Sequence, residues 1–358
     1  MNKIFIEDCC EILDSMRVPI TASKREIGEY PYYGANGIQD YVADYIFDDE
    51  LVLLAEDGGN FGSKERPIAY RVSGKCWVNN HAHVLKPKVG LDIDYLCYSL
   101  MFYKVDGLIN GATRKKLTQA AMRKMQIPFR SIKEQIHIVN ELNRIIKIKE
   151  KRQEELKLLD NLIKARFVEM FGDVIHNDRK WECRKFSDIT ASRLGKMLDT
   201  KHQTGTCQYS YLANFNVQWF GFELKNLNKM DFNEKDREEF CLEDGDLLVC
   251  EGGEIGRCAV WHNQVENCFF QKALHRVRCN QEIILPDYLA WWFKYNCDHG
   301  GFVAIEGAKA TISHLTGAKM KMLNVTVPPI GLQKQFTSFV NQVDKSKVVI
   351  TNIRIFSL

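Results

Sequence analysis

The fold is decided by residues 131–171, which read SIKEQIHIVNELNRIIKIKEKRQEELKLLDNLIKARFVEMF. This stretch contains no Gly and no Pro, and it lies between Pro128 and Gly172. Ser131 and Glu134 form an S-x-x-E capping box, which satisfies free backbone donors at a helix start, and Gly172 supplies a left-handed stop. A helix of this length measures about 60 Å, more than one compact domain needs. We therefore interpret it as a spacer between two domains.

Apolar residues recur along this stretch at intervals of three and four, and most other positions are Lys, Arg or Glu. The pattern predicts one apolar stripe that needs a partner and a charged remainder that faces water. The stripe consists of Ile132, Ile136, Val139, Leu142, Ile145, Ile146, Ile148, Leu156, Leu159, Leu162, Ile163, Phe167 and Met170.

The composition is that of a soluble protein with two domains. The chain has 358 residues, of which 45% are hydrophobic and 27% are charged, and length alone favours two domains. No apolar run approaches the roughly 18 residues of a membrane helix, and the amino terminus lacks a basic leader, so we expect a cytoplasmic protein with no membrane partner. The twelve Cys residues form no C-x-x-C pair, which favours scattered small hydrophobes over disulfides or metal ligands.

Charge is unevenly distributed along the first part of the chain. Acidic residues dominate 1–60, whereas basic residues dominate 61–130. Two interpretations stay open: one basic face that could contact phosphate, or two segments whose charges interleave and cancel in the fold.

A second copy of the same sequence pattern follows Gly172. Residues 1–130 mix short apolar runs with Gly and Asn turns, and they predict helices at 92–103 and around 117–125, which together indicate an α+β domain. The matching motifs are 50–59 with 246–253, His83 with His275, 94–96 with 287–289, Leu117-Thr118 with Leu315-Thr316, and Ile127-Pro128 plus Gln135 with Val327-Pro328 plus Gln335. The chain is therefore predicted to be a tandem repeat of one domain and one helix.

The repeat sets the expected boundaries. We predict domains at 1–130 and 173–330, a long helix at 131–172 and a shorter helix at 331–358. The second helix is less well capped, because Gly331 and Lys334 stand where the first helix has Ser and Glu. Two helices in tandem repeats, each with an apolar stripe that needs a partner, most simply pack on each other as an antiparallel pair.

The length difference leaves part of the first stripe without a predicted intramolecular partner. Either the second helix has been shortened, or a partner protein covers the far end of the long helix. The residues predicted to bind that partner are Leu156, Leu159, Ile163, Phe167 and Met170.

The sequence contains no motif that predicts catalysis. It lacks a P-loop and a G-x-G-x-x-G that enters a helix. The Gly-rich stretches that begin at Asp57 and Glu251 start with an acid that would repel phosphate, so we predict tight turns. His81 and His83 could offer two imidazoles to a metal, but the second copy keeps only His275, which favours ordinary strand positions. We predict no catalytic residue and no metal site.

Loop positions and side-chain types favour nucleic-acid binding instead. Lys and Arg on loops can meet phosphates, and Asn and Gln can read base edges. The candidates in the first copy are Asn36, Gln39, Asn60, Lys64, Arg66, Asn79, Asn80, Thr113, Arg114, Lys115 and Lys116. Those in the second copy are Asn214, Asn216, Arg257, Gln271, Lys272, Lys309, Thr311 and Ser313. An ordinary solvated side chain is the alternative for each.

The chain resembles the specificity subunit of type I restriction-modification enzymes over nearly its whole length. The resemblance rests on 28–37, on the Leu-Leu-Ala-Glu-Asp-Gly-Gly-Asn run, on 111–113, and on the Ile127-Pro128 that leads into a long helix closing on 170–173. It implies two tandem target recognition domains, each reading half of a split double-stranded DNA sequence, and two long helices in an antiparallel coiled coil. It also implies methyltransferase and restriction (translocase and nuclease) subunits as partners, which would hold the S-adenosylmethionine and ATP. No base-contacting residue transfers by motif.

Two other functions remain open. A related specificity subunit could serve a fused nuclease-methyltransferase, which co-purification would reveal. A scaffold that binds only proteins would ignore DNA.

Overall fold

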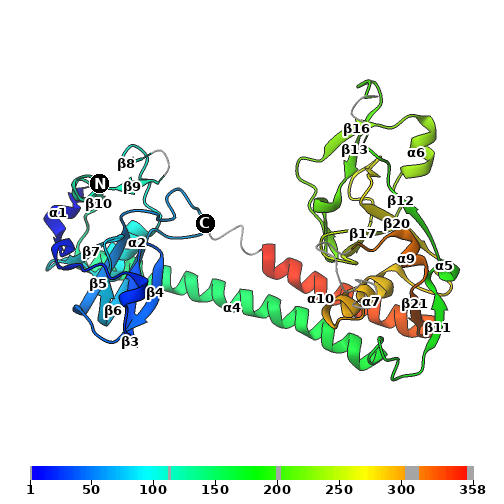
Figure 1. Cartoon of the computed structure of the whole chain (residues 1–358), viewed down its shortest axis with the longest axis horizontal. Helices are drawn as coiled ribbons and strands as arrows, with labels where there is room; N and C mark the ends of the chain where they lie inside the picture. The colour runs from blue at the N-terminus through cyan, green and yellow to red at the C-terminus, as the bar shows by residue number, and fades with distance from the viewer. Residues whose placement is uncertain (1, 112–113, 199–202, 303–313, 353–358) are drawn as a thin grey trace. The chain divides into compact units, whose positions relative to one another are not determined.

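The computed structural model describes residues 2–111, 114–198, 203–302 and 314–352. The chain divides into two compact units, Met1–Lys151 (unit 1) and Arg152–Leu358 (unit 2). Both units combine strands and helices, so the predicted α+β class is confirmed (Figure 1). Among the described residues, no helix combines the length and apolarity needed to cross a bilayer. All twelve Cys are free and most are buried.

Unit 1 is built on a six-stranded sheet with the order β2-β7-β5-β6-β3-β4. Side chains of β5 alternate between two cores: Leu51 and Leu53 join one cluster, and Val52 and Leu54 join the other. This alternation is the two-residue period of a strand buried on both faces. The elements are β1 Lys3–Phe5, α1 Ile6–Cys9, β2 Cys10–Ile12, β3 Ile27–Gly34, β4 Gly37–Val42, β5 Phe47–Ala55, β6 Ala69–Val78, β7 Ala82–Pro87, α2 Ile93–Met101, β8 Ile109–Asn110, β9 Lys116–Leu117, α3 Gln119–Arg123 and β10 Gln126–Pro128, with short 3₁₀ turns η1 Asp14–Met16 and η2 Ala22–Lys24.

Unit 2 distributes its strands over a four-stranded sheet, β12-β20-β17-β18, and a three-stranded sheet, β16-β13-β19. Aromatic side chains of α7 fill the core between the first sheet and the long helices. The elements are β11 Glu182–Lys185, α5 Phe186–Ile189, β12 Thr190–Leu194, β13 Gln208–Leu212, η4 Asn214–Asn216, β14 Val217–Gln218, β15 Gly221–Phe222, β16 Asn228–Asp231, α6 Glu234–Phe240, β17 Leu247–Cys250, β18 Cys258–Val260, β19 Phe269–Phe270, β20 Leu274–Cys279, α7 Pro286–Asp298, α9 Gly317–Lys321 and β21 Asn324–Val327.

The strand register confirms the repeat. Leu54 on β5 pairs with His83 on β7, and Val249 on β17 pairs with His275 on β20 in the same antiparallel manner. Likewise β1 pairs with β10, and β11 pairs with β21, at the base of each unit. The predicted match of His83 with His275 is therefore a match in three dimensions.

One predicted match is wrong by two residues. The Gln135 Oε1 accepts from the Asp92 N–H at 2.8 Å, and the Gln333 Oε1 accepts from the Leu285 N–H at the same distance. Both Gln side chains are fully buried. The structural counterpart of Gln135 is therefore Gln333 and not Gln335. The sequence match failed because Pro128 and Pro328 do not occupy equivalent positions in the two copies.

The start of the second long helix agrees with the corrected match. Helix α10 covers Ile330–Asn352, one residue earlier than predicted. With the corrected match, Pro329 and Leu332 occupy the places of Ser131 and Glu134, so the polar capping box is absent there. In the first helix that box is confirmed, because the Ser131 N–H donates to Glu134 Oε2 at 3.0 Å.

Helix α4 runs without interruption over Ile132–Phe171, as predicted, and ends at Gly172 with a φ of 72°. Its first part belongs to unit 1, where Val139 is buried in the core. Residues 143–151 are all exposed. Among them Ile145 and Ile148 are apolar side chains that the described part of the chain leaves open to solvent.

The last part of α4 packs against α10 within unit 2. The ring of Phe336 lies 5.4 Å from that of Phe167, and Lys347 Nζ lies 2.8 Å from Asp160 Oδ1. From the first contact to the second, the residue number rises along α10 and falls along α4, so the two helices are antiparallel, as predicted.

This packing overturns the expectation that the far end of the α4 stripe lacks an intramolecular partner. Ile163 and Phe167 are about 1% exposed, and they contact α7 and α10 in the core of unit 2. Leu156, Leu159 and Met170 are half-buried. Sequence periodicity indicated the stripe but could not tell which part of it would be covered.

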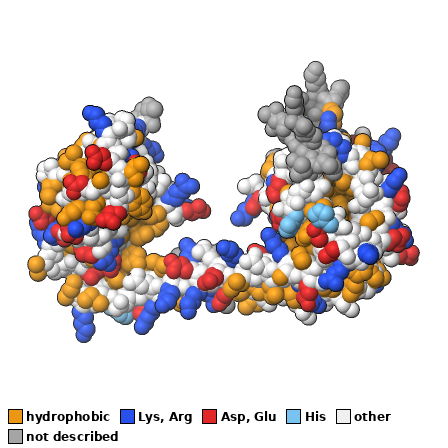
Figure 2. All heavy atoms as spheres, turned by 60° about the horizontal axis from the view of Figure 1, so that its bottom comes forward, with side chains coloured by type: hydrophobic (Ala, Val, Ile, Leu, Met, Phe, Trp, Pro, Cys, Tyr) orange, Lys and Arg blue, Asp and Glu red, His pale blue; other side chains and the backbone are white. Residues whose placement is uncertain are grey.

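The charges of the acidic and basic segments of unit 1 interleave. Arg71 pairs with Glu50 at 2.6 Å, and Lys116 pairs with Glu56 at 3.0 Å. On the face drawn in Figure 2, basic and acidic side chains are interspersed over both units. The second interpretation of the charge distribution is therefore the one that applies to these pairs.

Candidate nucleic-acid interface

Three loops of unit 1 are joined by hydrogen bonds. Asn36 lies in the turn between β3 and β4, and its Nδ2 donates to the Gly58 carbonyl at 3.0 Å. Gly58 belongs to the loop after β5, and the Leu117 N–H donates to the Glu56 carbonyl at 2.7 Å. We call these three segments, with residues 114–117 as the third, the loop cluster, and we include in it the turn 79–81, whose His81 carbonyl accepts from the Glu56 N–H at 2.9 Å. Recognition residues commonly occupy loops that a rigid scaffold holds in place.

A related joint is built in unit 2, where the Asn amide reaches the loop after the buried strand one residue earlier. Asn214 Nδ2 donates to the Gly252 carbonyl at 2.9 Å, in the loop after β17. The Leu315 N–H donates to the Glu251 carbonyl at 2.8 Å. The backbone framework of the loop cluster is therefore shared by the two units.

The Gly-rich stretches form tight turns, as predicted. Gly58 has a φ of 63° and Gly253 has a φ of 82°, values that suit Gly because it lacks a Cβ. The chain can reverse directly after each buried strand for this reason.

The cations of the loop cluster are held by neighbouring acids but stay accessible. Arg114 Nη2 lies 3.1 Å from Asp57 Oδ1, and the side chain is 60% exposed. Lys116 pairs with Glu56 and is 49% exposed. A recess of about 440 Å³ beside them is lined by Lys64, Lys104 and Lys115, among others. This arrangement gives orientation to the cations and leaves them free to meet a phosphate.

The predicted site residues fall into four groups. Those that are exposed are Asn36, Gln39, Lys64, Arg66, Asn80, Arg114, Lys115, Lys116 and Lys272. Those that are half-buried are Asn60, Asn214, Arg257 and Gln271. Those that are buried are Asn79 and Asn216. Thr113, Lys309, Thr311 and Ser313 lie outside the described residues.

The two buried Asn residues cannot read a base edge, so the prediction for them is wrong. Asn79 Nδ2 donates to Gln39 Oε1 at 2.9 Å, and its Oδ1 accepts from the His81 N–H at 2.8 Å. Asn216 Oδ1 accepts from the Ala213 N–H at 2.8 Å. Asn favours turns because its amide bonds nearby backbone, and in both cases this local role uses the side chain.

Arg257 has a local role as well. Its Nη2 donates to Asn214 Oδ1 at 2.6 Å. The guanidinium therefore holds the Asn214 amide in the orientation that reaches the Gly252 carbonyl.

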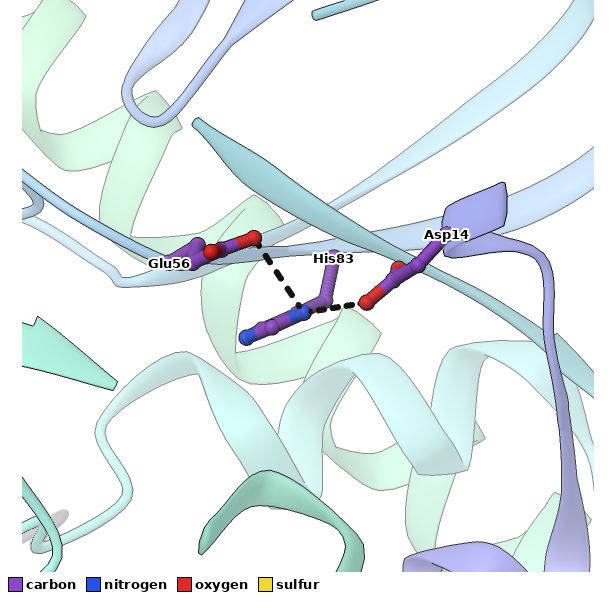
Figure 3. Close-up of side chains that lie close together, drawn as sticks. All are labelled: Asp14, Glu56 and His83. Carbon is purple, nitrogen blue, oxygen red and sulfur yellow. Dashed lines mark hydrogen bonds and ion pairs between the residues drawn. The ribbon is translucent and has the colours of Figure 1, made fainter. Parts of the chain in front are cut away.

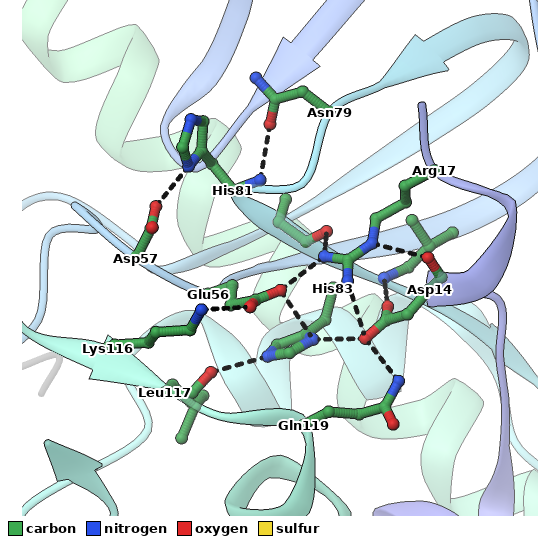
Figure 4. Close-up of polar contacts among 12 residues, drawn as sticks. Asp14, Arg17, Glu56, Asp57, Asn79, His81, His83, Lys116, Leu117 and Gln119 are labelled. Atoms are coloured by element: carbon green, nitrogen blue, oxygen red, sulfur yellow. Dashed lines mark hydrogen bonds and ion pairs between the residues drawn. The ribbon is translucent and has the colours of Figure 1, made fainter. Parts of the chain in front are cut away.

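His81 is the residue of the loop cluster that the candidate list missed. Its Nδ1 lies 2.5 Å from Asp57 Oδ1, whereas the His83 ring points into the core and bonds Asp14 (Figure 4). The two imidazoles therefore serve different acids and do not converge on one point. Comparison of the repeats could have found it, because the second copy keeps a His only at the buried position.

Asp14, Glu56 and His83 bring their polar atoms within 4.8 Å of one another (Figure 3). His83 Nδ1 lies 2.6 Å from Asp14 Oδ2, and its Nε2 lies 2.9 Å from the Leu117 carbonyl. Both ring nitrogens are thus engaged with partners inside the protein, Nδ1 with Asp14 and Nε2 with the Leu117 carbonyl, so neither points toward an open metal position. Arg17 Nη1 lies 2.6 Å from Glu56 Oε2 and occupies that carboxylate. The group is an ion-pair network.

This network ties the loop cluster to the core. Burial alone would raise the pKa of Asp14, but the hydrogen bond and charge of His83, with the Val84 N–H, hold that pKa below its ordinary value. His83 in turn holds the Leu117 carbonyl. Because Leu117 follows Lys116 directly, this contact also fixes the backbone that carries Lys116.

Comparison with known proteins gives a consistent family. The model of the type I restriction modification DNA specificity domain matches residues 1–158 and 178–356. A Haemophilus influenzae protein described as a type I restriction enzyme specificity subunit is 27% identical over 348 residues, covering 94% of this chain and 86% of that protein. The EcoprrI specificity subunit of Escherichia coli is 26% identical over 119 residues, covering 33% of this chain and 28% of its own.

Solved structures share the fold. The type I restriction-modification S subunit of M. genitalium aligns with a TM-score of 0.56 at 13% identity, covering 99% of this chain and 93% of that chain. A chain from a study of complex assembly and conformational transition in the type I system aligns with a TM-score of 0.59 at 12% identity, covering 99% and 92%.

Proposed function

The chain belongs to the type I restriction-modification DNA specificity family, and we propose that each of its two units reads one half of a bipartite, asymmetric DNA target. In such an arrangement the chain is a non-catalytic specificity subunit. It directs methylation and restriction that are carried out by other subunits.

The observation that carries this proposal is the twice-built loop cluster. An Asn amide bonds a Gly carbonyl in both units, with distances of 3.0 and 2.9 Å. The side chains on this shared framework differ: Lys116 precedes Leu117 in unit 1, whereas His314 precedes Leu315 in unit 2. A common framework with different polar groups suits two readers of different base sequences.

We propose that the exposed candidates of the loop clusters contact DNA. Arg114, Lys115, Lys116 and Lys272 would meet phosphates, and Asn36 and Asn80 would approach base edges. Phosphate contacts fix the register of a protein on the duplex, and base contacts specify the sequence.

We also propose that helix α4 sets the gap between the half-sites. Residues 143–151 are all exposed, and the hydrogen bond from Tyr98 to Asn143 lies at the start of this segment, so a change of length near Glu150 would leave it in place. A continuous helix converts residue number into distance at 1.5 Å per residue.

The partners follow from the same proposal. Methyltransferase and restriction subunits would hold S-adenosylmethionine and ATP, and this chain would supply neither. The exposed Ile145 and Ile148 on α4 offer apolar surface to such a subunit. In this scheme the chain works in the cytoplasm, where host DNA is methylated.

Binding measurements test the proposal. The chain, assembled with its methyltransferase subunits, should bind its own target far more tightly than a scrambled duplex. Its affinity should fall steeply as salt rises, because phosphate contacts release counterions. An affinity that is indifferent to base sequence would instead favour a protein-binding scaffold.

A further inference from the structure

His81 and Asp57 form a pair in the loop cluster of unit 1 to which the proposed function gives no role. His81 lies in the turn before β7, and Asp57 follows β5, with 2.5 Å between Nδ1 and Oδ1. The His81 backbone is fixed by the buried Asn79 side chain. The His81 side chain is nevertheless 33% exposed. The ring is thus held firmly at the surface and separate from the buried network (Figure 4).

Asp57 decides which ring nitrogen of His81 carries the proton. The carboxylate is an acceptor, so Nδ1 donates to it. Arg114 Nη2 lies 3.1 Å from the same Oδ1, so the carboxylate is held from two sides. With its Nδ1–H directed at the carboxylate, the neutral form of the imidazole presents Nε2 as a hydrogen-bond acceptor. No residue in the described part of the chain donates to that Nε2.

Unit 2 shows which backbone hydrogen bonds of the loop cluster are kept where this pair is absent. The Glu56 N–H donates to the His81 carbonyl at 2.9 Å, and the Glu251 N–H donates to the Ala273 carbonyl at 2.9 Å. Ala273 is therefore the counterpart of His81. Gly252, which follows Glu251, is the counterpart of Asp57.

Both members of the pair are thus missing from unit 2, although the backbone bonds that hold the turn are kept. The fold of the loop cluster does not require an imidazole or a carboxylate at these two positions. Their presence together in one unit and joint absence from the other indicate that they act together in something that only unit 1 does.

We propose that His81 reads one base of the half-site recognised by unit 1, with Asp57 as its positioning residue. The Nε2 would accept a hydrogen bond from an exocyclic amino group, adenine N6 or cytosine N4, at the floor of the major groove. This inference rests on the proposed function, because it names one contact of the same interface.

Competition binding with a set of duplexes tests the assignment. Each base pair of both half-sites is changed singly, and the complex with methyltransferase subunits is titrated. His81→Ala, which copies unit 2, should lose roughly 10- to 100-fold of discrimination at one position of the first half-site. The second half-site and the salt dependence should stay unchanged. Asp57→Asn should weaken discrimination at that same position by less, because a neutral amide orients the ring less strongly.

His176→Ala serves as the control, since that His is an exposed residue outside the loop cluster that pairs only with Asp173 in the described structure. Thermal unfolding of each variant checks the fold. Unchanged discrimination in His81→Ala, or equal weakening for every duplex, would overturn the assignment. A base analogue without the exocyclic amino group at the affected position, purine for adenine or 2-pyrimidinone for cytosine, should lose the same discrimination, and unchanged binding to that analogue would overturn the acceptor role. If the unaltered complex itself shows no preference, the proposed function fails first.

Discussion

His83 and His275 occupy the same place in the two units, yet their chemistry differs. Both ring nitrogens of His83 have partners, Nδ1 with Asp14 and Nε2 with the Leu117 carbonyl. The His275 Nε2 is buried without a hydrogen-bond partner among the described residues, and burial lowers the pKa of this His, with Lys321 acting in the same direction and Glu251 against it. The sequence could predict that the two His correspond. It could not predict the difference, because the partners of His83 come from distant segments.

Unit 2 should therefore lose stability on mild acidification. A pKa that is lower in the folded than in the unfolded state gives a contribution that is complete above the ordinary His value of about 6.5 and is lost as pH falls toward the folded value. The loss is at most about 1.4 kcal/mol per pH unit for this one group. His275→Gln takes up no proton, so its unit 2 should lose less stability between pH 7 and pH 5.

Hydrogen exchange of unit 2 peptides across that pH range measures the effect. His262→Gln is the matched control, because it makes the same substitution at an exposed His of the same unit. Identical pH dependence in His275→Gln and the unaltered chain would contradict the account.

Helix α4 shows what sequence periodicity can and cannot give at the scale of an element. The absence of Gly and Pro, the Ser131 cap and the Gly172 stop predicted its bounds to within one residue. The apolar stripe stated only that these side chains need a partner. Which part is covered depends on where α10 starts and how far it runs. The sequence match of Pro128 with Pro328 predicted that start one residue too late.

The covered and open parts of α4 should respond differently to truncation. Phe167 packs on the rings of Tyr288, Trp291 and Phe336, so Phe167→Ala should cost unit 2 about 3–5 kcal/mol of unfolding free energy. Ile146→Ala removes a side chain that is 37% exposed and should cost less than about 1 kcal/mol. Denaturant unfolding gives both values. Equal costs would mean that the α4–α10 packing is not what holds unit 2 together.

At the scale of the whole molecule, the internal repeat carried most of what the sequence could tell. It predicted two α+β units, an antiparallel helix pair and diverged surfaces on a shared framework. It also directed attention to loops after the buried strands. It did not separate Asn36, which is exposed, from Asn79, which is buried. Both are Asn residues in turns, and only the surrounding packing decides whether an amide faces solvent or holds a neighbour.

The central claim is that two readers are spaced by one helix, and a change of helix length tests it most directly. Four helix-forming residues inserted after Glu150 fall in the exposed part of α4 and lengthen it by about 6 Å. Since the duplex rises 3.4 Å per base pair, the gap between half-sites should widen by one or two base pairs. Genome-wide methylation mapping in cells that carry the partner subunits reads the gap and both half-sites together. The account predicts a wider gap with both half-sites unchanged, and altered half-sites with the original gap would contradict it.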